Sequence, residues 1–286
     1  MTWLTWTIIY VVSLVAYYFF SKKLFNEQKN VDPRFYGGLL QLTVGIVGLI
    51  PALLEGWYFV WNQTTVLWLV VVAVAYTIGP SLYYTGLKHT HLSVTTTLDA
   101  VGAIYALILG TLMLSEPLNW QKILGAGLIL LAVIVVSGKN SKLGKLTKYE
   151  ILLLIAPIFY VIGGIADKTL VQYSNASTYL AMSFLVAGLT MTGVNLPRLK
   201  TVGIESIVNK NFLSTIGVSG VFIAVAAYAS YRAYLVGGEV SVMYPIMQTE
   251  SVVVPFMAMW LFGERERFGH KIVGALLAFG GVWFLR

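Results

Sequence analysis

Long apolar stretches separated by short polar loops dominate the chain. A helix needs roughly 20 apolar residues to cross about 30 Å of hydrocarbon, and ten stretches approach or reach that length. The predicted helices are residues 3–20, 35–54, 66–87, 92–114, 120–137, 151–170, 178–196, 212–236, 240–262 and 268–285. In lipid each backbone amide must be bonded within its own segment. The sequence therefore predicts an all-α integral membrane protein with ten transmembrane helices.

The apolar pattern occurs twice. Residues 83–116 return as residues 231–264 at a constant offset of 148. A hydrophilic, basic linker at residues 138–149 separates a first repeat at residues 1–137, with helices one to five, from a second repeat at residues 150–286, with helices six to ten. Because each repeat has an odd number of helices, the second is turned upside down relative to the first, which gives two inverted five-helix repeats.

Composition and charge agree with a membrane protein. The chain is 58% hydrophobic and 11% charged, whereas soluble domains carry about 25% charged residues. Fifteen of the 19 Lys and Arg residues lie in loops after odd-numbered helices. By the positive-inside rule these loops are cytoplasmic and both termini lie outside. The net charge of +7 is thus a topology signal, and no nucleic-acid partner is expected.

A short motif follows the fourth helix of each repeat. Residues 263–264 read Gly-Glu and are followed by Lys-Ile-Val-Gly-Ala at 271–275, while residues 115–116 read Ser-Glu and are followed by Lys-Ile-Leu-Gly-Ala at 122–126. Through these motifs the chain resembles the EamA-type transporters of the drug/metabolite transporter superfamily, over essentially its whole length.

The chain departs from the family pattern in three ways. Ser115 stands where the family has Gly, and the fourth helix of the first repeat lacks the proline that the second repeat has at Pro245 and Pro255. The family's termini are cytoplasmic, whereas the charge bias here favours the outside. The resemblance implies export of amino acids or similar metabolites through a central site between helices one to four and six to nine, with helices five and ten at the periphery.

Two acidic residues stand out in the middle of predicted membrane helices, where a charge costs at least about 2.5 kcal/mol. They are Asp99 and Glu250, displaced by three residues in the repeat frame and so on nearly the same helix face. Both could bind a cationic or amino-bearing substrate, or exchange a proton for it. The alternative is a structural ion pair or a neutral, hydrogen-bonded acid. Arg232 is either an anion-binding group or a static partner of Glu239 or Glu250.

Four uncharged residues complete the predicted substrate site. Gln41 and Gln248 suit a polar substrate, or a hydrogen bond between helices. Tyr105 and Tyr244 lie deepest among many tyrosines, most of which belong to packing or to interfacial belts. The recurring Glu116 and Glu264 are predicted to cap the helix that follows each of them.

The sequence predicts a secondary transporter working by alternating access in the cell membrane. Its partners are a small-molecule substrate, the lipid bilayer and protons as a coupling ion, and the protein is a monomer or homodimer. No cofactor, metal or catalytic residue is predicted, and no phosphate-binding loop is present. The alternatives are a non-transporting receptor or assembly protein, and an intramembrane enzyme, which the loop positions of His89, His91 and His270 disfavour.

Overall fold

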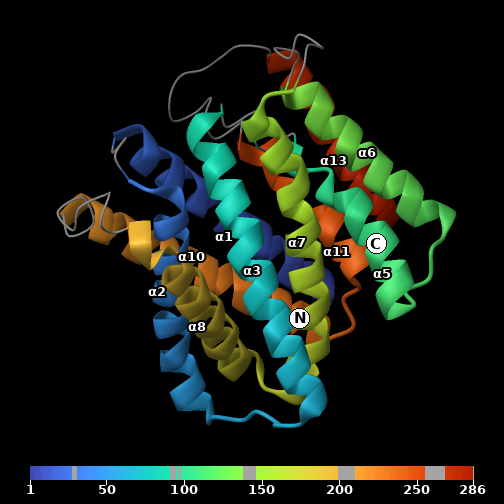
Figure 1. Ribbon diagram of the computed structural model, residues 1–286. Coiled ribbons are helices and arrows are strands. Elements are labelled where there is room, and N and C mark those ends of the chain that lie inside the picture. The colour runs from blue at the N-terminus through green and yellow to red at the C-terminus, as the bar shows by residue number, and fades with distance from the viewer. Residues whose placement is uncertain are drawn as a thin grey trace.

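The computed structural model is helical throughout the regular elements it describes (Figure 1). It describes residues 1–27, 31–90, 95, 98–137, 146–198, 210–254 and 268–285. The longer helices are α1 (Trp3–Glu27), α2 (Pro33–Glu55), α3 (Gln63–His89), α7 (Lys148–Leu170), α8 (Ala176–Asn195) and α10 (Lys210–Leu235). The shorter ones are α5 (Gly102–Leu114), α6 (Trp120–Ser137), α11 (Val240–Met247) and α13 (Phe268–Leu285), with 3-10 turns at Val171–Tyr173 and Leu196–Arg198.

Six helices are long and apolar enough to cross a membrane: α1, α2, α3, α7, α8 and α10. Three shorter apolar helices accompany them within the described ranges, in α5, α6 and α13. Large apolar side chains lie on the outside of the bundle, as Leu54 (83% exposed), Leu112 (74%) and Phe279 (71%) show. An apolar exterior of this kind matches lipid rather than water. The predicted all-α membrane protein is therefore confirmed at this level.

Helix starts follow from local capping. The Asp32 carboxylate accepts hydrogen bonds from the backbone N–H groups of Arg34 and Phe35 at the start of α2. Thr147 and Glu150 form a reciprocal capping box at the start of α7. Because these contacts satisfy backbone donors that have no partner within the helix, α7 begins at 148, three residues before the apolar stretch from which it was predicted.

The predicted continuous helices 92–114 and 240–262 are wrong in one respect, because each has a break at the same repeat position. Residues 100–101 and residues 248–249 are turns, and 248 is 100 shifted by the repeat offset. The backbone bonds match too: Ala103 N–H to Ala100 carbonyl (3.0 Å) corresponds to Ser251 N–H to Gln248 carbonyl (3.0 Å). These bonds span three residues instead of four, so both helices tighten locally to 3-10 geometry, which often marks a functional hinge.

Helices from before and after the linker pack in a regular scheme. The closest pairs are α2 with α8, α1 with α10, α3 with α7, and α6 with α13, followed by α3 with α8 and α5 with α11. Glycines permit the approach: a Cβ at Gly45 would lie 2.8 Å from the Leu185 backbone nitrogen, and one at Gly188 would lie 2.6 Å from the Leu42 nitrogen. Every one of these seams joins a helix of the first repeat to a helix of the second.

Candidate functional site

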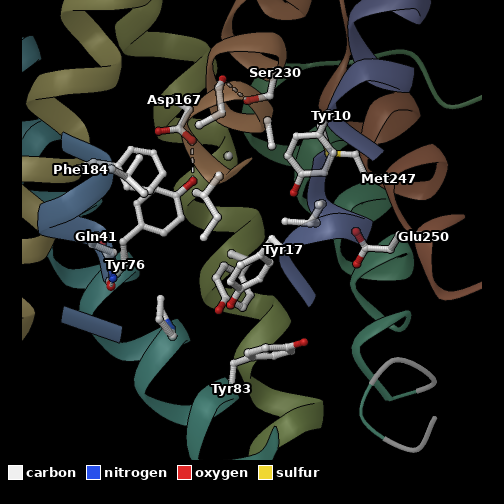
Figure 2. A pocket seen from close by; sticks show the side chains of 18 of the residues that line it. Tyr10, Tyr17, Gln41, Tyr76, Tyr83, Asp167, Phe184, Ser230, Met247 and Glu250 are labelled. Carbon is white, nitrogen blue, oxygen red and sulfur yellow. Dashed lines mark hydrogen bonds between the residues drawn. The ribbon is translucent and has the colours of Figure 1, made fainter. Parts of the chain in front are cut away.

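A cavity of about 180 Å³ lies in the middle of the bundle, between the two repeats (Figure 2). Its described lining comes from α1, α2, α3, α7, α8, α10 and α11, and from Asp99, Gln248 and Glu250 at or next to the two breaks. Neither α6 nor α13 contributes a described lining residue, as the peripheral position expected for the fifth and tenth helices requires. The cavity is small beside the roughly 300–1,000 Å³ of clefts for drug-sized ligands, so it suits a small solute.

Tyrosine is the most frequent residue in the cavity wall. Ten tyrosines line it, from both repeats: Tyr10, Tyr17, Tyr18, Tyr76, Tyr83, Tyr84, Tyr160, Tyr231, Tyr234 and Tyr244. Several contact one another edge to face, including Tyr83 with Tyr84 and with Tyr160. Each ring combines an apolar, π-rich face with a polar hydroxyl, so the wall can accommodate an apolar body and still offer hydrogen bonds.

Three buried acids share this cavity. Asp99 is 8% exposed, Asp167 4% and Glu250 3%. Figure 2 shows Asp167 and Glu250 projecting into the cavity from opposite sides of the view. No Lys, Arg or His is among the described lining residues. Since a buried carboxylate is stable only when paired or hydrogen-bonded, the partners of each acid decide what the site can do.

Asp99 and Glu250 are only partly satisfied. One Glu250 oxygen, Oε1, accepts a 2.8 Å hydrogen bond from the Tyr18 hydroxyl, while Oε2 has no partner among the described residues. Asp99 Oδ1 also lacks one. The break in each repeat places these acids on the cavity, because Asp99 directly precedes the first break and Glu250 directly follows the second.

The two glutamines add further free acceptors. Gln41 Nε2 donates to the Tyr76 carbonyl (2.9 Å) and to Met191 Sδ (3.2 Å), which fixes the orientation of the amide and leaves Oε1 unpartnered within the described structure. Gln248 Oε1 is likewise buried without a described partner. Gln41 therefore does make the hydrogen bonds between helices that were the alternative to a substrate role, and the remaining oxygens of the two amides are unpaired acceptors at the cavity.

Asp167 is fully satisfied and was not foreseen from the sequence. Its two oxygens accept hydrogen bonds from the Tyr76 hydroxyl (2.5 Å) and the Tyr179 hydroxyl (2.7 Å). The rule that singled out Asp99 and Glu250, a charge inside an apolar helix, applies equally to Asp167, which lies three residues before the end of α7. Because Asp167 lies near the helix end and next to Lys168, the sequence pattern there is that of an ordinary charged helix end.

Of the seven substrate-site residues predicted from the sequence, five line the cavity: Asp99, Glu250, Gln248, Gln41 and Tyr244. Tyr105 and Arg232 are not among its described lining. The Tyr105 hydroxyl donates to the Leu154 carbonyl at 3.3 Å, and the Arg232 guanidinium lies 5.6 Å over the Trp6 ring. Glu239, considered as an Arg232 partner, is instead paired with Lys122.

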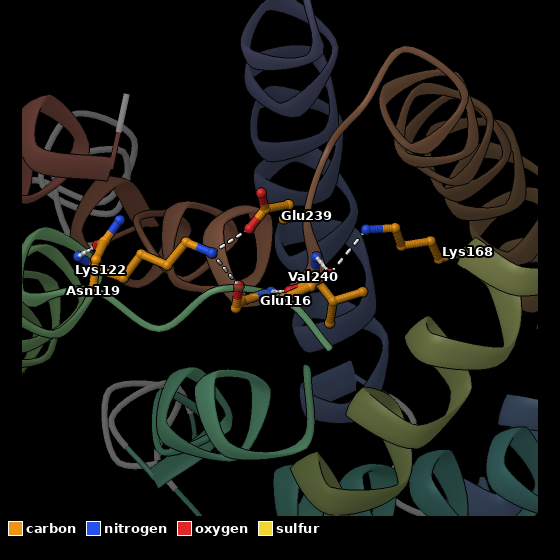
Figure 3. Close-up of polar contacts among 7 residues, drawn as sticks. Glu116, Asn119, Lys122, Lys168, Glu239 and Val240 are labelled. Carbon is orange, nitrogen blue, oxygen red and sulfur yellow. Dashed lines mark hydrogen bonds and ion pairs between the residues drawn. The ribbon is translucent and has the colours of Figure 1, made fainter. Parts of the chain in front are cut away.

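The prediction that Glu116 caps the following helix is wrong. Its carboxylate accepts the backbone N–H groups of Val240 and Ser241, both at 2.8 Å, and so caps α11 in the other repeat (Figure 3). The helix that follows Glu116, α6, is capped instead by the side chain of Asn119, which accepts the Lys122 N–H at 2.9 Å. The turn after α5 brings Glu116 against α11 because α5 and α11 pack side by side.

An ion-pair network surrounds this cross-repeat cap (Figure 3). Lys168 Nζ donates to Glu116 Oε1 at 2.8 Å, and Lys122 bonds both Glu239 and the Ser241 hydroxyl. Burial alone would raise the pKa of Glu116, which lies in the loop after α5, but the bonds from Lys168 and Ser241 outweigh burial and hold this pKa below its usual range. Glu116 is therefore a charged structural clamp between the repeats.

Some sequence predictions fall outside the described residues. These are Glu264 with the preceding Gly263, Pro255, and the charged linker residues up to 145. Within the described ranges no group of three His, Cys, Asp or Glu side chains could hold a metal ion. The site as described is thus one of carboxylates, amides and tyrosines.

Comparison with known proteins identifies the family. A solved structure described only as "Crystal structure of protein" is 14% identical, with a TM-score of 0.71, over 98% of this chain and 96% of that one, a likeness that shows the fold alone. No curated protein matches the chain. The model of the EamA-like transporter family matches residues 1–138 and 147–286. The chain therefore belongs to the EamA-like transporter family, whose members are multi-pass membrane transporters rather than enzymes.

Proposed function

We propose that this protein is a secondary transporter that moves a small polar or amphipathic metabolite across the cell membrane by alternating access. The observation that carries the proposal is the cavity between the repeats, in which buried carboxylate and amide oxygens have no described protein partner. Buried polar groups in proteins are hydrogen-bonded almost without exception. Groups left unpaired in a central cavity of a transporter-family protein are what a transported solute would satisfy.

The proposed architecture is ten membrane helices in two inverted repeats, residues 1–137 and 150–286, joined by the linker 138–149. Three observations support it. The family model matches two segments of similar length, the helix breaks recur at the repeat offset, and the packing scheme is symmetric. Exchanging first and second repeats turns α1 with α10 into α7 with α3 and leaves α2 with α8 and α6 with α13 unchanged.

Alternating access would expose the cavity to each side of the membrane in turn. Related repeats suit this cycle because inverted halves can exchange conformations around a fixed central site. Protons are the proposed coupling ion, with Asp99 and Glu250 as the groups that exchange them. The charge bias of the loops supports a topology with both termini outside, and export is the direction that we propose.

Counterflow in proteoliposomes tests the transport function. Vesicles containing the purified protein are loaded with a pool of unlabelled amino acids and small amines, and uptake of each radiolabelled member is followed. We expect saturable exchange of at least one member, absent from protein-free vesicles and reduced in Glu250→Gln. The absence of exchange for every member, from protein that is monodisperse and folded, would overturn the proposal.

A reporter fused after Arg286 tests the orientation. A reporter that is active only outside the cytoplasm should give a signal, because the loops after odd-numbered helices hold most of the basic residues. Activity of a reporter that works only in the cytoplasm would reverse the topology and leave the transport proposal intact.

A further inference from the structure

The free polar atoms of the cavity share one property: they accept hydrogen bonds. Gln41 Oε1, Asp99 Oδ1, Gln248 Oε1 and Glu250 Oε2 are acceptors, and the Tyr83 hydroxyl both accepts and donates. All four acceptor-only oxygens belong to side chains at least nine-tenths buried. The buried side-chain atoms of the described lining that lack a partner include no nitrogen donor. A ligand that completes this site must therefore donate several hydrogen bonds.

The charge of the cavity points the same way. Asp99, Asp167 and Glu250 are its acids, and its described lining has no basic side chain to offset them. Asp167 is already engaged by two tyrosine hydroxyls, which leaves Asp99 and Glu250 as the open carboxylates. A cation with N–H donors would relieve the unmet acceptors and the unbalanced charge together.

A primary ammonium group meets both requirements. It carries one positive charge, three donors and no acceptor, and the open oxygens of Asp99, Gln248 and Glu250 supply three acceptors from residues that line the same cavity. The tyrosine wall adds cation–π attraction for the ammonium and apolar contact for the rest of the molecule. The remainder of the ligand must be compact, given the volume of about 180 Å³.

A carboxylate on the same ligand would find nothing to bind. The nearby basic residues are engaged elsewhere, Lys168 with Glu116 and Lys122 with Glu239, and Arg232 stacks on Trp6 outside the described lining. An amino acid would bring a further negative charge into a buried cavity that already has three acids, at a high desolvation cost. The site thus fits an amine better than the amino acid that bears the same side chain.

We propose that the transported solute is a small primary amine with an apolar, aryl or alkyl, body and no carboxylate. Asp99, Glu250 and Gln248 bind the ammonium group, and the tyrosines enclose the body. This inference rests on the proposed transport function and narrows its substrate class from amino acids and similar metabolites to amines.

Three matched ligands test the proposal by titration calorimetry on the purified full-length protein in detergent. They are 2-phenylethylamine, L-phenylalanine, which adds a carboxylate, and the N,N,N-trimethyl derivative of 2-phenylethylamine, which keeps the charge and the ring but has no N–H donor. We expect 2-phenylethylamine to bind at least roughly tenfold more tightly than either of the other two ligands. L-Phenylalanine brings a carboxylate that the acidic site opposes, and the trimethyl derivative cannot donate a charge-assisted hydrogen bond.

The outcomes separate the alternatives. Equal or tighter binding of L-phenylalanine would overturn the exclusion of a carboxylate, and equal binding of the trimethyl derivative would assign the site to quaternary cations instead. Lack of binding by all three ligands at millimolar concentration would also reject the proposal.

Two variants locate the site, with one matched control. Glu250→Gln and Asp99→Asn each remove one open carboxylate and should weaken 2-phenylethylamine binding at least roughly tenfold. The control Glu150→Gln removes a carboxylate at the start of α7 while the amide preserves the capping box, and it should bind as the unaltered protein does. Unchanged binding in both cavity variants, or an equal loss in the control, would contradict the assignment.

Counterflow distinguishes failure of this inference from failure of the transport function. Exchange of amino acids without binding of 2-phenylethylamine would retain the transporter and reject the amine. Binding of 2-phenylethylamine with the expected selectivity, but no exchange of any solute, would retain the ligand class and reject transport.

Discussion

Two groups of buried acids in this protein have opposite surroundings. Glu116 accepts two backbone N–H groups and a Lys168 ammonium, so its charge is matched and its oxygens are occupied. Asp99 and Glu250 line the central cavity, whose described lining has no basic residue, and each keeps an open oxygen. The difference shows that burial of a carboxylate does not define its role. Its partners do: a matched acid holds the repeats together, and an unmatched one is available to a ligand.

The comparison is most sharply tested by Glu116→Ala. Truncation leaves the N–H groups of Val240 and Ser241 without their acceptor and Lys168 without its partner, so the free energy of unfolding should fall by about 3–5 kcal/mol. Thermal and denaturant unfolding of the detergent-solubilised protein measures the change, with Glu150→Gln as the near-neutral control. A loss under about 1 kcal/mol would mean that the clamp contributes no more than a surface ion pair.

The pH dependence of stability provides a milder test of the same clamp. The folded pKa of Glu116 lies below its unfolded value of about 4.3, so its stabilising contribution is fully present above that value. The contribution is lost as the pH falls through the folded pKa. Between about pH 6 and pH 3 the unaltered protein should therefore lose more thermal stability than Glu116→Gln does. Parallel losses in the two proteins would show that Glu116 is not the titrating clamp.

Asp167 is intermediate and tests whether neutral donors suffice to satisfy a buried acid. Asp167→Asn keeps one carbonyl acceptor but sets an amide NH₂ against the second tyrosine hydroxyl, Tyr76 or Tyr179. We expect a loss of about 1–2 kcal/mol in the free energy of unfolding, measured in the same detergent. A neutral result would group Asp167 with the open acids of the cavity rather than with the structural ones.

The smallest change in stability should come from the cavity acids themselves. Glu250→Gln retains the Oε1 acceptor for Tyr18 and removes a buried carboxylate with an open oxygen, so the free energy of unfolding should change by less than about 0.5 kcal/mol or rise. Unfolding without ligand, compared with Glu116→Ala, is the measurement. A loss as large as that of Glu116→Ala would erase the distinction between the two groups of acids.

The helical membrane fold was predictable because the length of each apolar stretch can be read directly from the sequence. The candidate site was partly predictable for the same reason: charges and amides inside apolar helices, such as Asp99, Glu250 and Gln41, stand out by their cost in lipid. The same rule applies to Asp167, but this residue lies near the end of its helix, where charged residues are common.

Features that depend on which helices become neighbours could not be predicted in this way. The cap that Glu116 supplies to α11 joins residues more than 120 positions apart, and no local pattern distinguishes it from a cap on the following helix. The displacement of Arg232 from the cavity toward Trp6 is likewise a result of packing. Local signals specify what a helix end needs, and only the assembled bundle decides which side chain supplies it.

The paired breaks give the molecule two points at which a helix can bend. Asp99 lies on one side of the first break and α5 on the other, and Glu250 lies on one side of the second break with α11 on the other. Glu116 follows α5 and caps α11, so it fixes these two helices to each other. If the proposed function holds, a solute bound by Asp99 and Glu250 would contact the chain across each break from this fixed pair. Binding could then bend the two helices at their breaks while the contact between α5 and α11 stays intact.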